Sequence, residues 1–259
     1  MSKKQSNATK QSNAQRAAER AAAIRREQES KQRRRRTLVV SVSALAVLAV
    51  VVAILVAVQS GRDTTGEAAT PPDGAVDTYA LPMGQTDAPV TVTVYEDFMC
   101  PYCGMFEGVS RDALKEYAAS GDVQVRYHVV SFLDGQSSSD YSTRAANALG
   151  VVLDQAGPDV AVRFHDLLYE NQPEEGGSGL SDEQLVDFAV EAGAEEADVM
   201  GPIESLKFEQ WVVNSTGEWS DRGHTGTPTV TVDGETVDFQ SAEDLLANTE
   251  QAIESALNE

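Results

Sequence analysis

The stretch VTVTVYEDFMCPYCGMF, residues 90–106, decides how the rest of the chain is interpreted. Its first part, Val90–Tyr95, is short and β-branched, which predicts a buried strand. Cys100 and Cys103, the two cysteines of the chain, follow with two residues between them, and a helix-like run covers residues 104–118. A C-x-x-C between a strand and a helix is the pattern of a redox-active pair.

The position of Cys100 favours its thiolate, the form of cysteine that acts as a nucleophile. The amino end of a helix carries unpaired N–H groups and a partial positive charge. We therefore expect the pKa of Cys100 to be lowered into the range of about 3.5–7.5. Cys103 lies one helical turn further on, so its sulfur can reach back across Pro101 and Tyr102 and close the disulfide.

Two other interpretations of the cysteine pair are weaker. A zinc site needs four ligands, and His128, His165 and His224 lack the spacing of a zinc motif relative to the cysteines. A purely structural disulfide across two residues would close a small loop and stabilise the fold little. We therefore expect redox activity, without an organic cofactor or a metal. A further open point is whether His224 approaches the pair.

The first 58 residues have the composition of a membrane anchor. Residues 1–36 hold twelve Lys or Arg against three Glu, and residues 37–58 are apolar without a charge. A helix of 22 residues spans the hydrocarbon core of roughly 30 Å. The positive-inside rule places residues 1–36 in the cytoplasm as a basic tail. We expect an uncleaved transmembrane signal anchor over residues 37–58 in the cell membrane, crossing it once.

The charge of the remaining chain fits a second compartment. The whole chain carries −21, and the basic tail carries +9, so the remainder carries −30. Such acidity favours solubility and argues against nucleic acid as a partner. Residues 59–78 have the composition of a flexible linker. We expect one extracytoplasmic domain over residues 79–259.

Within this domain, strand patterns flank a long helical block at about 138–220. The order strand, helix, strand at its start indicates a parallel pair of strands. The expected strands are residues 90–95, 123–132, 227–233 and 235–239, and the expected helices are residues 104–118, 141–155, 159–170, 185–192, 204–218 and 242–257. Ser181 and Gln184 form a capping-box pattern ahead of the third helix of this block, residues 185–192.

A second motif, Gly226-Thr227-Pro228-Thr229, precedes the late strand. Proline cannot donate to a central ladder, so Pro228 belongs at a strand start or an edge. A cis bond between Thr227 and Pro228 would expose the Thr227 backbone for pairing with a client protein. An ordinary turn proline is the alternative.

The three motifs GQTDAPV at 84–90, YEDFMCPYC at 95–103 and GTPT at 226–229 together resemble the DsbA-like thioredoxin family, in particular its membrane-anchored actinobacterial type. Phe164-His165-Asp166 and Asn171-Gln172 resemble that family as well. The resemblance covers about residues 79–258. It implies an α/β thioredoxin fold with an inserted helical domain. It also implies that Cys100 is the exposed attacking cysteine, that Cys103 resolves, and that Thr227-Pro228 is a cis-proline loop facing them.

The sequence departs from the wider thioredoxin pattern beside the cysteines. Many relatives carry a buried acid six residues before the first cysteine, where this chain has Val94. Glu96 faces the same side if the strand continues, so it is a candidate for handling the proton of Cys103, and a solvated strand end is the alternative. Pro101-Tyr102 replaces the Pro-His of strongly oxidising relatives, and tyrosine lacks the charge of a protonated histidine.

The expected function is thiol–disulfide exchange that introduces disulfides into exported proteins with free cysteines. By resemblance, reoxidation implies an integral-membrane, quinone-linked thiol oxidase, and we expect a monomer. A reductase or isomerase of the same fold is one alternative. A non-catalytic, membrane-anchored binding module is another, and a redox-regulated anchor for the cell envelope is a third.

Overall fold

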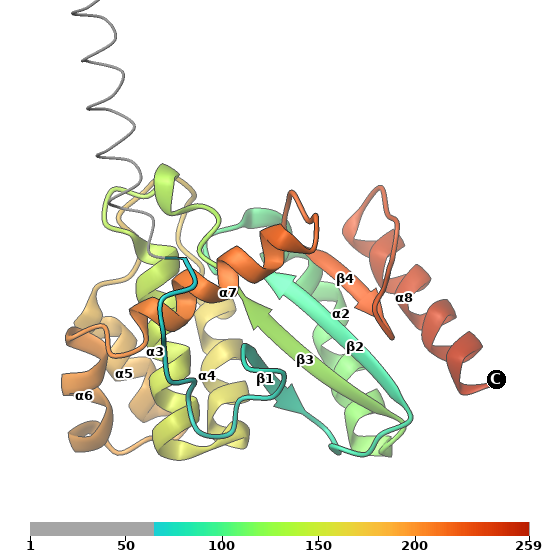
Figure 1. The fold of residues 1–259 in the computed structure, drawn as a ribbon, viewed down its shortest axis with the longest axis horizontal. Helices are drawn as coiled ribbons and strands as arrows, with labels where there is room; N and C mark the ends of the chain where they lie inside the picture. The colour runs from blue at the N-terminus through green and yellow to red at the C-terminus, as the bar shows by residue number, and fades with distance from the viewer. Residues whose placement is uncertain (1–64, 259) are drawn as a thin grey trace, which may run out of the picture. The chain divides into compact units, whose positions relative to one another are not determined.

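The computed structural model describes residues 65–258 (Figure 1). The basic tail at 1–36 and the expected membrane span at 37–58 lie outside the described residues. Between residues 65 and 258, no helix is both long and apolar enough to cross a membrane.

A five-stranded sheet with the order β1-β3-β2-β4-β5 forms the centre of the domain. The central strand β2 (Val90–Glu96) pairs in parallel with β3 (Val123–Val129) and antiparallel with β4 (Thr229–Val232). At the edges, β1 (Ala80–Met83) pairs antiparallel with β3, and β5 (Glu235–Thr236) pairs antiparallel with β4. β2 is alternately and then continuously buried, as expected for the middle strand.

Two helices cover one face of this sheet. α2 (Pro101–Ser120) follows β2 directly, and α8 (Ala242–Leu257) closes the chain. They pack against each other, α2 against β3 and α8 against β2 and β4. β2 leads directly into α2 (Figure 1). The two cysteines therefore lie at the amino end of this helix.

The helical insertion lies between β3 and β4. It consists of α3 (Tyr141–Ala156), α4 (Pro158–Glu170), α5 (Asp182–Ala192), α6 (Glu196–Glu204) and α7 (Glu209–Asp221), preceded by a short 3-10 turn at Asp134–Gln136. α4 contacts β1 and α7 contacts β3, so the insertion packs against the sheet as well as against itself. The fold is the predicted α/β thioredoxin arrangement with a helical insertion.

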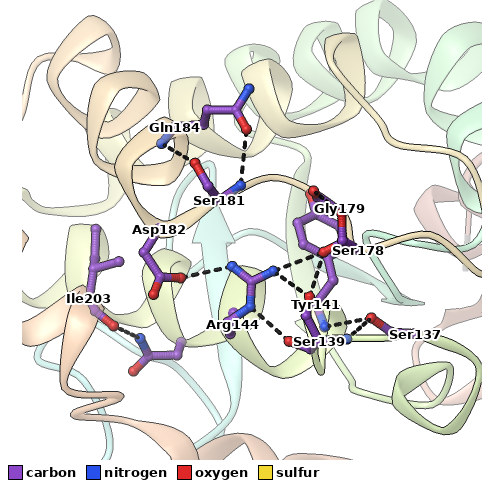
Figure 2. Close-up of polar contacts among 11 residues, drawn as sticks. Ser137, Ser139, Tyr141, Arg144, Ser178, Gly179, Ser181, Asp182, Gln184 and Ile203 are labelled. Carbon is purple, nitrogen blue, oxygen red and sulfur yellow. Dashed lines mark hydrogen bonds and ion pairs between the residues drawn. The ribbon is translucent and has the colours of Figure 1, made fainter.

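Polar contacts join the start of α3 to the loop before α5 (Figure 2). The guanidinium of Arg144 pairs with Asp182 at 2.8 Å and donates to the carbonyl oxygen of Ser178 at 3.0 Å. The predicted capping box is present, because the Gln184 N–H donates to Ser181 Oγ at 3.2 Å and the Ser181 N–H donates to Gln184 Oε1 at 3.0 Å. The glycine-containing loop before α5 is therefore held in place by side chains of both helices.

Several predicted boundaries were wrong for identifiable reasons. The expected helix over residues 204–218 begins only at Glu209, as α7, because Leu206 adopts a left-handed backbone with φ 53° after α6 ends at Glu204; α6 itself was not predicted. Buried apolar residues lie on both sides of this break, so the spacing of apolar residues in the sequence does not show where the helix ends. β3 ends at Val129 rather than at 132, since its partner β2 ends at Glu96 in the pair Glu96–Val129.

The segment before β1 is attached to the insertion. Gly66 N–H donates to Asn214 Oδ1 at 2.8 Å, Asp73 N–H donates to Asp154 Oδ1 at 3.0 Å, and the Trp211 indole donates to the Thr78 carbonyl at 2.7 Å. These contacts fall in the part of the expected linker, residues 59–78, that the structure describes. They fix the path of this segment along α3 and α7.

Candidate redox site

Cys100 is the N-cap residue of α2, and Pro101 is its first helical residue. Proline suits this position because it lacks the N–H that would stay unpaired there. The Cys100 N–H donates to the Asp97 carbonyl at 2.9 Å, and its carbonyl accepts from Gly104 N–H at 3.2 Å. Both cysteines are free thiols. Cys100 is 5% exposed and Cys103 is 1% exposed, so Cys100 is less accessible than the resemblance implied.

The Thr227-Pro228 motif lies against Cys100. The peptide bond between these residues is cis, so the ordinary turn proline is the wrong alternative. Thr229, the first residue of β4, pairs with Tyr95 of β2, which places the loop before β4 beside the end of β2. The Cys100 Sγ donates to the Thr227 carbonyl oxygen at 3.3 Å. The sheet thus brings the two sequence motifs together.

The two thiols have opposite acid–base properties. The hydrogen bond from the Cys103 side chain lowers the pKa of Cys100 to about 6, against the effect of burial, with help from Thr227 and the N–H groups of Cys103 and Tyr102. Burial raises the pKa of Cys103 well above 9.0. The prediction of a lowered Cys100 pKa is confirmed, but the partner thiol contributes most, and the helix N–H groups contribute less.

Asp97 organises the loop that leads into the cysteines, a role the sequence analysis missed. Its Oδ1 accepts from the Met99 N–H at 2.8 Å and from Ser142 Oγ at 2.6 Å, and its Oδ2 accepts from the Leu133 N–H at 2.8 Å. Burial raises the pKa of Asp97 to about 7, although these three hydrogen bonds oppose it. A carboxylate followed by two apolar residues, Phe98 and Met99, and then by the C-x-x-C is the signal that could have identified it.

Gln172, which follows α4, anchors the same loop from the insertion. Its Nε2 donates to the Phe98 carbonyl at 3.1 Å and to the Cys100 carbonyl at 2.9 Å. A Cβ added at Gly104 would lie 2.1 Å from Gln172 Oε1, so glycine at 104 allows this approach. The Asn171-Gln172 motif entered the sequence analysis through resemblance alone, and the structure gives it a physical role.

Charged side chains are buried beneath the redox helix. The Glu96–Glu107–His165 cluster takes one residue each from β2, α2 and α4. Glu96 is 1% exposed, and Glu107 and His165 are each 0% exposed. Glu96 Oε1 lies 2.5 Å from His165 Nε2, so Glu96 is not the solvated strand end that was the alternative. Burial lowers the pKa of His165, but the carboxylates of Glu96, Asp166 and Glu107 together outweigh it, and the pKa rises to about 10. Burial raises the pKa of Glu107 to about 7.

The outer side of the redox helix is apolar and open. Tyr102 is 66% exposed and Met105 is 50% exposed, and Val109, one turn further, is also exposed. These positions, spaced by three and four residues, share one face of α2. His224 does not reach the cysteines through any contact that the structure gives; its ring lies 4.7 Å from that of Tyr95.

This geometry matches known proteins. The sequence model of the thioredoxin family matches residues 77–251. The chain belongs to the thioredoxin family. The domain resembles the solved structure of the reduced disulfide bond oxidoreductase DsbG from Mycobacterium tuberculosis, with 29% identity, a TM-score of 0.58 and coverage of 69% of this chain and 92% of that chain. Reduced DsbA from the same organism gives 28% identity, a TM-score of 0.57 and coverage of 69% and 98%. The chain is a thioredoxin-family protein of the DsbA type.

Among curated proteins, the chain is similar to the serine/threonine-protein kinase PknE of Mycobacterium tuberculosis. The two are 35% identical over 117 residues, which cover 44% of this chain and 21% of PknE. The chain therefore spans about a fifth of that kinase's length.

Proposed function

We propose that this protein is a dithiol oxidase, in which Cys100 exchanges disulfides with client proteins and Cys103 is the resolving cysteine. The observation that carries this proposal is the pair of opposed acidities. The pKa of Cys100 is lowered to about 6, whereas that of Cys103 is raised well above 9.0. At neutral pH, Cys100 is the better leaving group and the stable thiolate of the reduced pair.

The exchange reaction follows from these positions. In the oxidised protein, a client thiolate attacks Cys100 Sγ, and a client–Cys100 disulfide forms while the Cys100–Cys103 bond breaks. The electron pair of that bond leaves on Cys103, which takes up a proton. A second client thiolate then attacks the client sulfur of the mixed disulfide, and Cys100 leaves as a thiolate. The client is oxidised by two electrons and the protein is reduced.

The direction of electron transfer, from the client to this protein, depends on how stable the reduced form of the cysteine pair is. A thiolate held by hydrogen bonds from Cys103 and from the N–H groups in the first turn of α2 stabilises the reduced form and makes the disulfide a stronger oxidant. The reductase alternative requires the opposite balance, in which the disulfide is the more stable form.

The surroundings of Cys100 suit an extended client. The Thr227 backbone lies at the thiol, and the apolar face of Tyr102, Met105 and Val109 adjoins it. Client backbone pairing at Thr227 and side-chain contact with this face would present a client cysteine to Cys100. Pro101 and Tyr102 then shape the edge by which the client enters.

The same proposal includes the cellular setting. The anchor at residues 37–58 holds the domain outside the cell membrane, with residues 1–36 in the cytoplasm. The clients are exported proteins with free cysteines, and a quinone-linked membrane thiol oxidase regenerates the disulfide. The protein acts as a monomer. Glu96 stays a prediction as the proton acceptor of Cys103, supported by its burial at the end of β2.

Oxidation of a reduced client by the full-length oxidised chain tests this function. We expect one equivalent of chain to form one client disulfide, and Cys100→Ser to form none. Cys103→Ser has no disulfide to donate and should oxidise no client either. When an oxidised client is added, its Cys100 thiolate should attack the client disulfide and remain in a mixed disulfide, which a gel without reductant displays. Client oxidation at the wild-type rate in the presence of Cys100→Ser would show that Cys100 does not carry the oxidation. The alternative of a non-catalytic binding module would then be favoured.

A further inference from the structure

We propose that the Glu96–Glu107–His165 cluster is a binding site for a divalent transition-metal cation of the Zn²⁺ class. Each residue offers one ligand atom, and the three atoms lie within 4.8 Å of one another. Zinc ligands in a tetrahedral site, with bonds of about 2.0–2.2 Å, lie roughly 3.4 Å apart. Small side-chain rotations therefore convert this arrangement into a coordination sphere with one position left for water.

The carboxylate of Glu107 points to a ligand. This side chain is completely buried, and neither of its oxygens has a hydrogen-bond partner. Glu96 Oε2 is also buried without a partner. An unsatisfied buried carboxylate is costly, since burial removes its hydration without replacing it. A cation between the two carboxylates satisfies both.

The charges around the cluster leave room for two positive charges. Arg111 lies 3.6 Å from Glu107 Oε2, but it also pairs with Asp166 at 3.3 Å and with Glu170 at 2.6 Å. Lys115 pairs with Asp166 at 2.5 Å. Arg111 and Lys115 therefore balance Asp166 and Glu170. Because a metal displaces the proton from a histidine ligand, the carboxylates of Glu96 and Glu107 then match one divalent cation bound by a neutral imidazole.

A second carboxylate stands behind the histidine. His165 Nε2 faces Glu96, whereas its Nδ1 lies 4.0 Å from Asp166 Oδ1. A metal-binding histidine typically donates its other ring N–H to a carboxylate, which orients the ring. Asp166 is in place for that role and is itself held by Lys115.

The ligand set selects the kind of cation. Mg²⁺ and Ca²⁺ prefer oxygen ligands throughout, whereas one imidazole with two carboxylates suits Zn²⁺ and its first-row neighbours. The cation would join β2, α2 and α4, and so fasten the insertion to the redox helix. Glu96 cannot bind the cation and accept the proton of Cys103 at the same time. A bound cation would therefore exclude the proton-acceptor role predicted for Glu96.

Zinc titration of the full-length chain, with the Cys100–Cys103 disulfide intact, tests this site. The disulfide keeps both sulfurs from binding metal. After removal of bound metal with a chelator, competition with a chromogenic zinc indicator at mildly alkaline pH should show one tight equivalent. Glu107→Gln should weaken binding at least ~10-fold, and Asp166→Asn by ~10–100-fold. Glu116→Gln, an exposed change on the same helix, should leave binding unchanged.

Two results would overturn the proposal. One is the absence of a stoichiometric site in the wild type, and the other is equal affinity of the wild type and Glu107→Gln. Circular dichroism of the metal-free variants checks that they are folded. X-ray absorption at the zinc edge of the wild type decides the matter without any variant. It should show nitrogen and oxygen ligands with one imidazole, whereas sulfur ligands would contradict this site.

Discussion

The Sγ atom of Cys100 lies 3.3 Å from the carbonyl oxygen of Thr227, although 127 residues separate them in the chain. The antiparallel pairing of β4 with β2 produces this contact, because Thr229 is opposite Tyr95. The nucleophile and the backbone that would receive a client are therefore set by the same pair of strands. The helical insertion contacts this site through the loop between β2 and α2, so substitutions in the insertion should alter the position of Cys100 through that loop.

The pKa of Cys100 should be measurable by its rate of alkylation as a function of pH. We expect reduced wild type to give an apparent pKa of about 6. In Cys103→Ser, the value should rise, because a serine hydroxyl fits the space of the thiol poorly and the leading hydrogen bond changes. Cys100→Ser is the control for alkylation of Cys103. An unshifted pKa of 9.0 in the wild type would contradict the proposed thiolate.

The stability of the reduced protein should depend on pH in a defined direction. The folded pKa of Cys100, about 6, lies below its ordinary value of 9.0, so folding favours the thiolate. This contribution is complete above pH 9.0 and is lost as the pH falls through about 6. Urea denaturation should show reduced protein losing stability relative to oxidised protein over this window. Parallel pH profiles of the two forms, or of reduced wild type and Cys100→Ser, would refute the linkage.

Replacement of Gln172 by alanine should loosen the cysteine loop. The carbonyls of Phe98 and Cys100 lose a donor, which we expect to cost about 1–3 kcal/mol of stability in urea denaturation. The rate of client oxidation should fall as well, because the loop that positions Cys100 becomes mobile. Gln251→Ala, an exposed change in α8, is the matched control. Equal stability of both variants would show that Gln172 does not anchor the loop.

Asp97→Asn should destabilise the protein through the same loop. The side-chain amide has one acceptor oxygen in place of two, so one of the N–H donors of Met99 and Leu133 loses its partner. We expect a loss of about 1–3 kcal/mol in the free energy of unfolding. Asp112→Asn, on the exposed side of α2, should change stability little. If Asp97→Asn unfolds at the same urea concentration as wild type, the three hydrogen bonds are dispensable.

Much of this arrangement could be predicted from local sequence patterns. The strand at Val90–Glu96, the helix after Cys100 and the closing helix at Ala242–Leu257 follow from periodicity and from the position of the cysteines. The GTPT motif could be identified as part of the site only by resemblance, since no local pattern places residue 227 beside residue 100.

The remaining features depend on contacts that a single sequence does not display. β1 was not predicted because it has only four residues and contains Pro82, which an edge strand tolerates. Asp97, Gln172 and Glu107 read as ordinary polar residues. Asp97 and Glu107 are buried, and Gln172 reaches the Cys100 carbonyl, only when the insertion packs on α2 and β2. No local pattern marks His165 as buried, yet it is 0% exposed and pairs with Glu96 of the sheet.

The equilibrium between the full-length chain and a glutathione redox buffer tests the central claim most directly. Gel-shift alkylation measures the reduced fraction, and Cys100→Ser gives the baseline. A stabilised Cys100 thiolate predicts a reduction potential well above that of the glutathione pool, more oxidising than roughly −200 mV. A potential far below that of the pool would contradict the oxidase and would indicate a reductase or a structural disulfide.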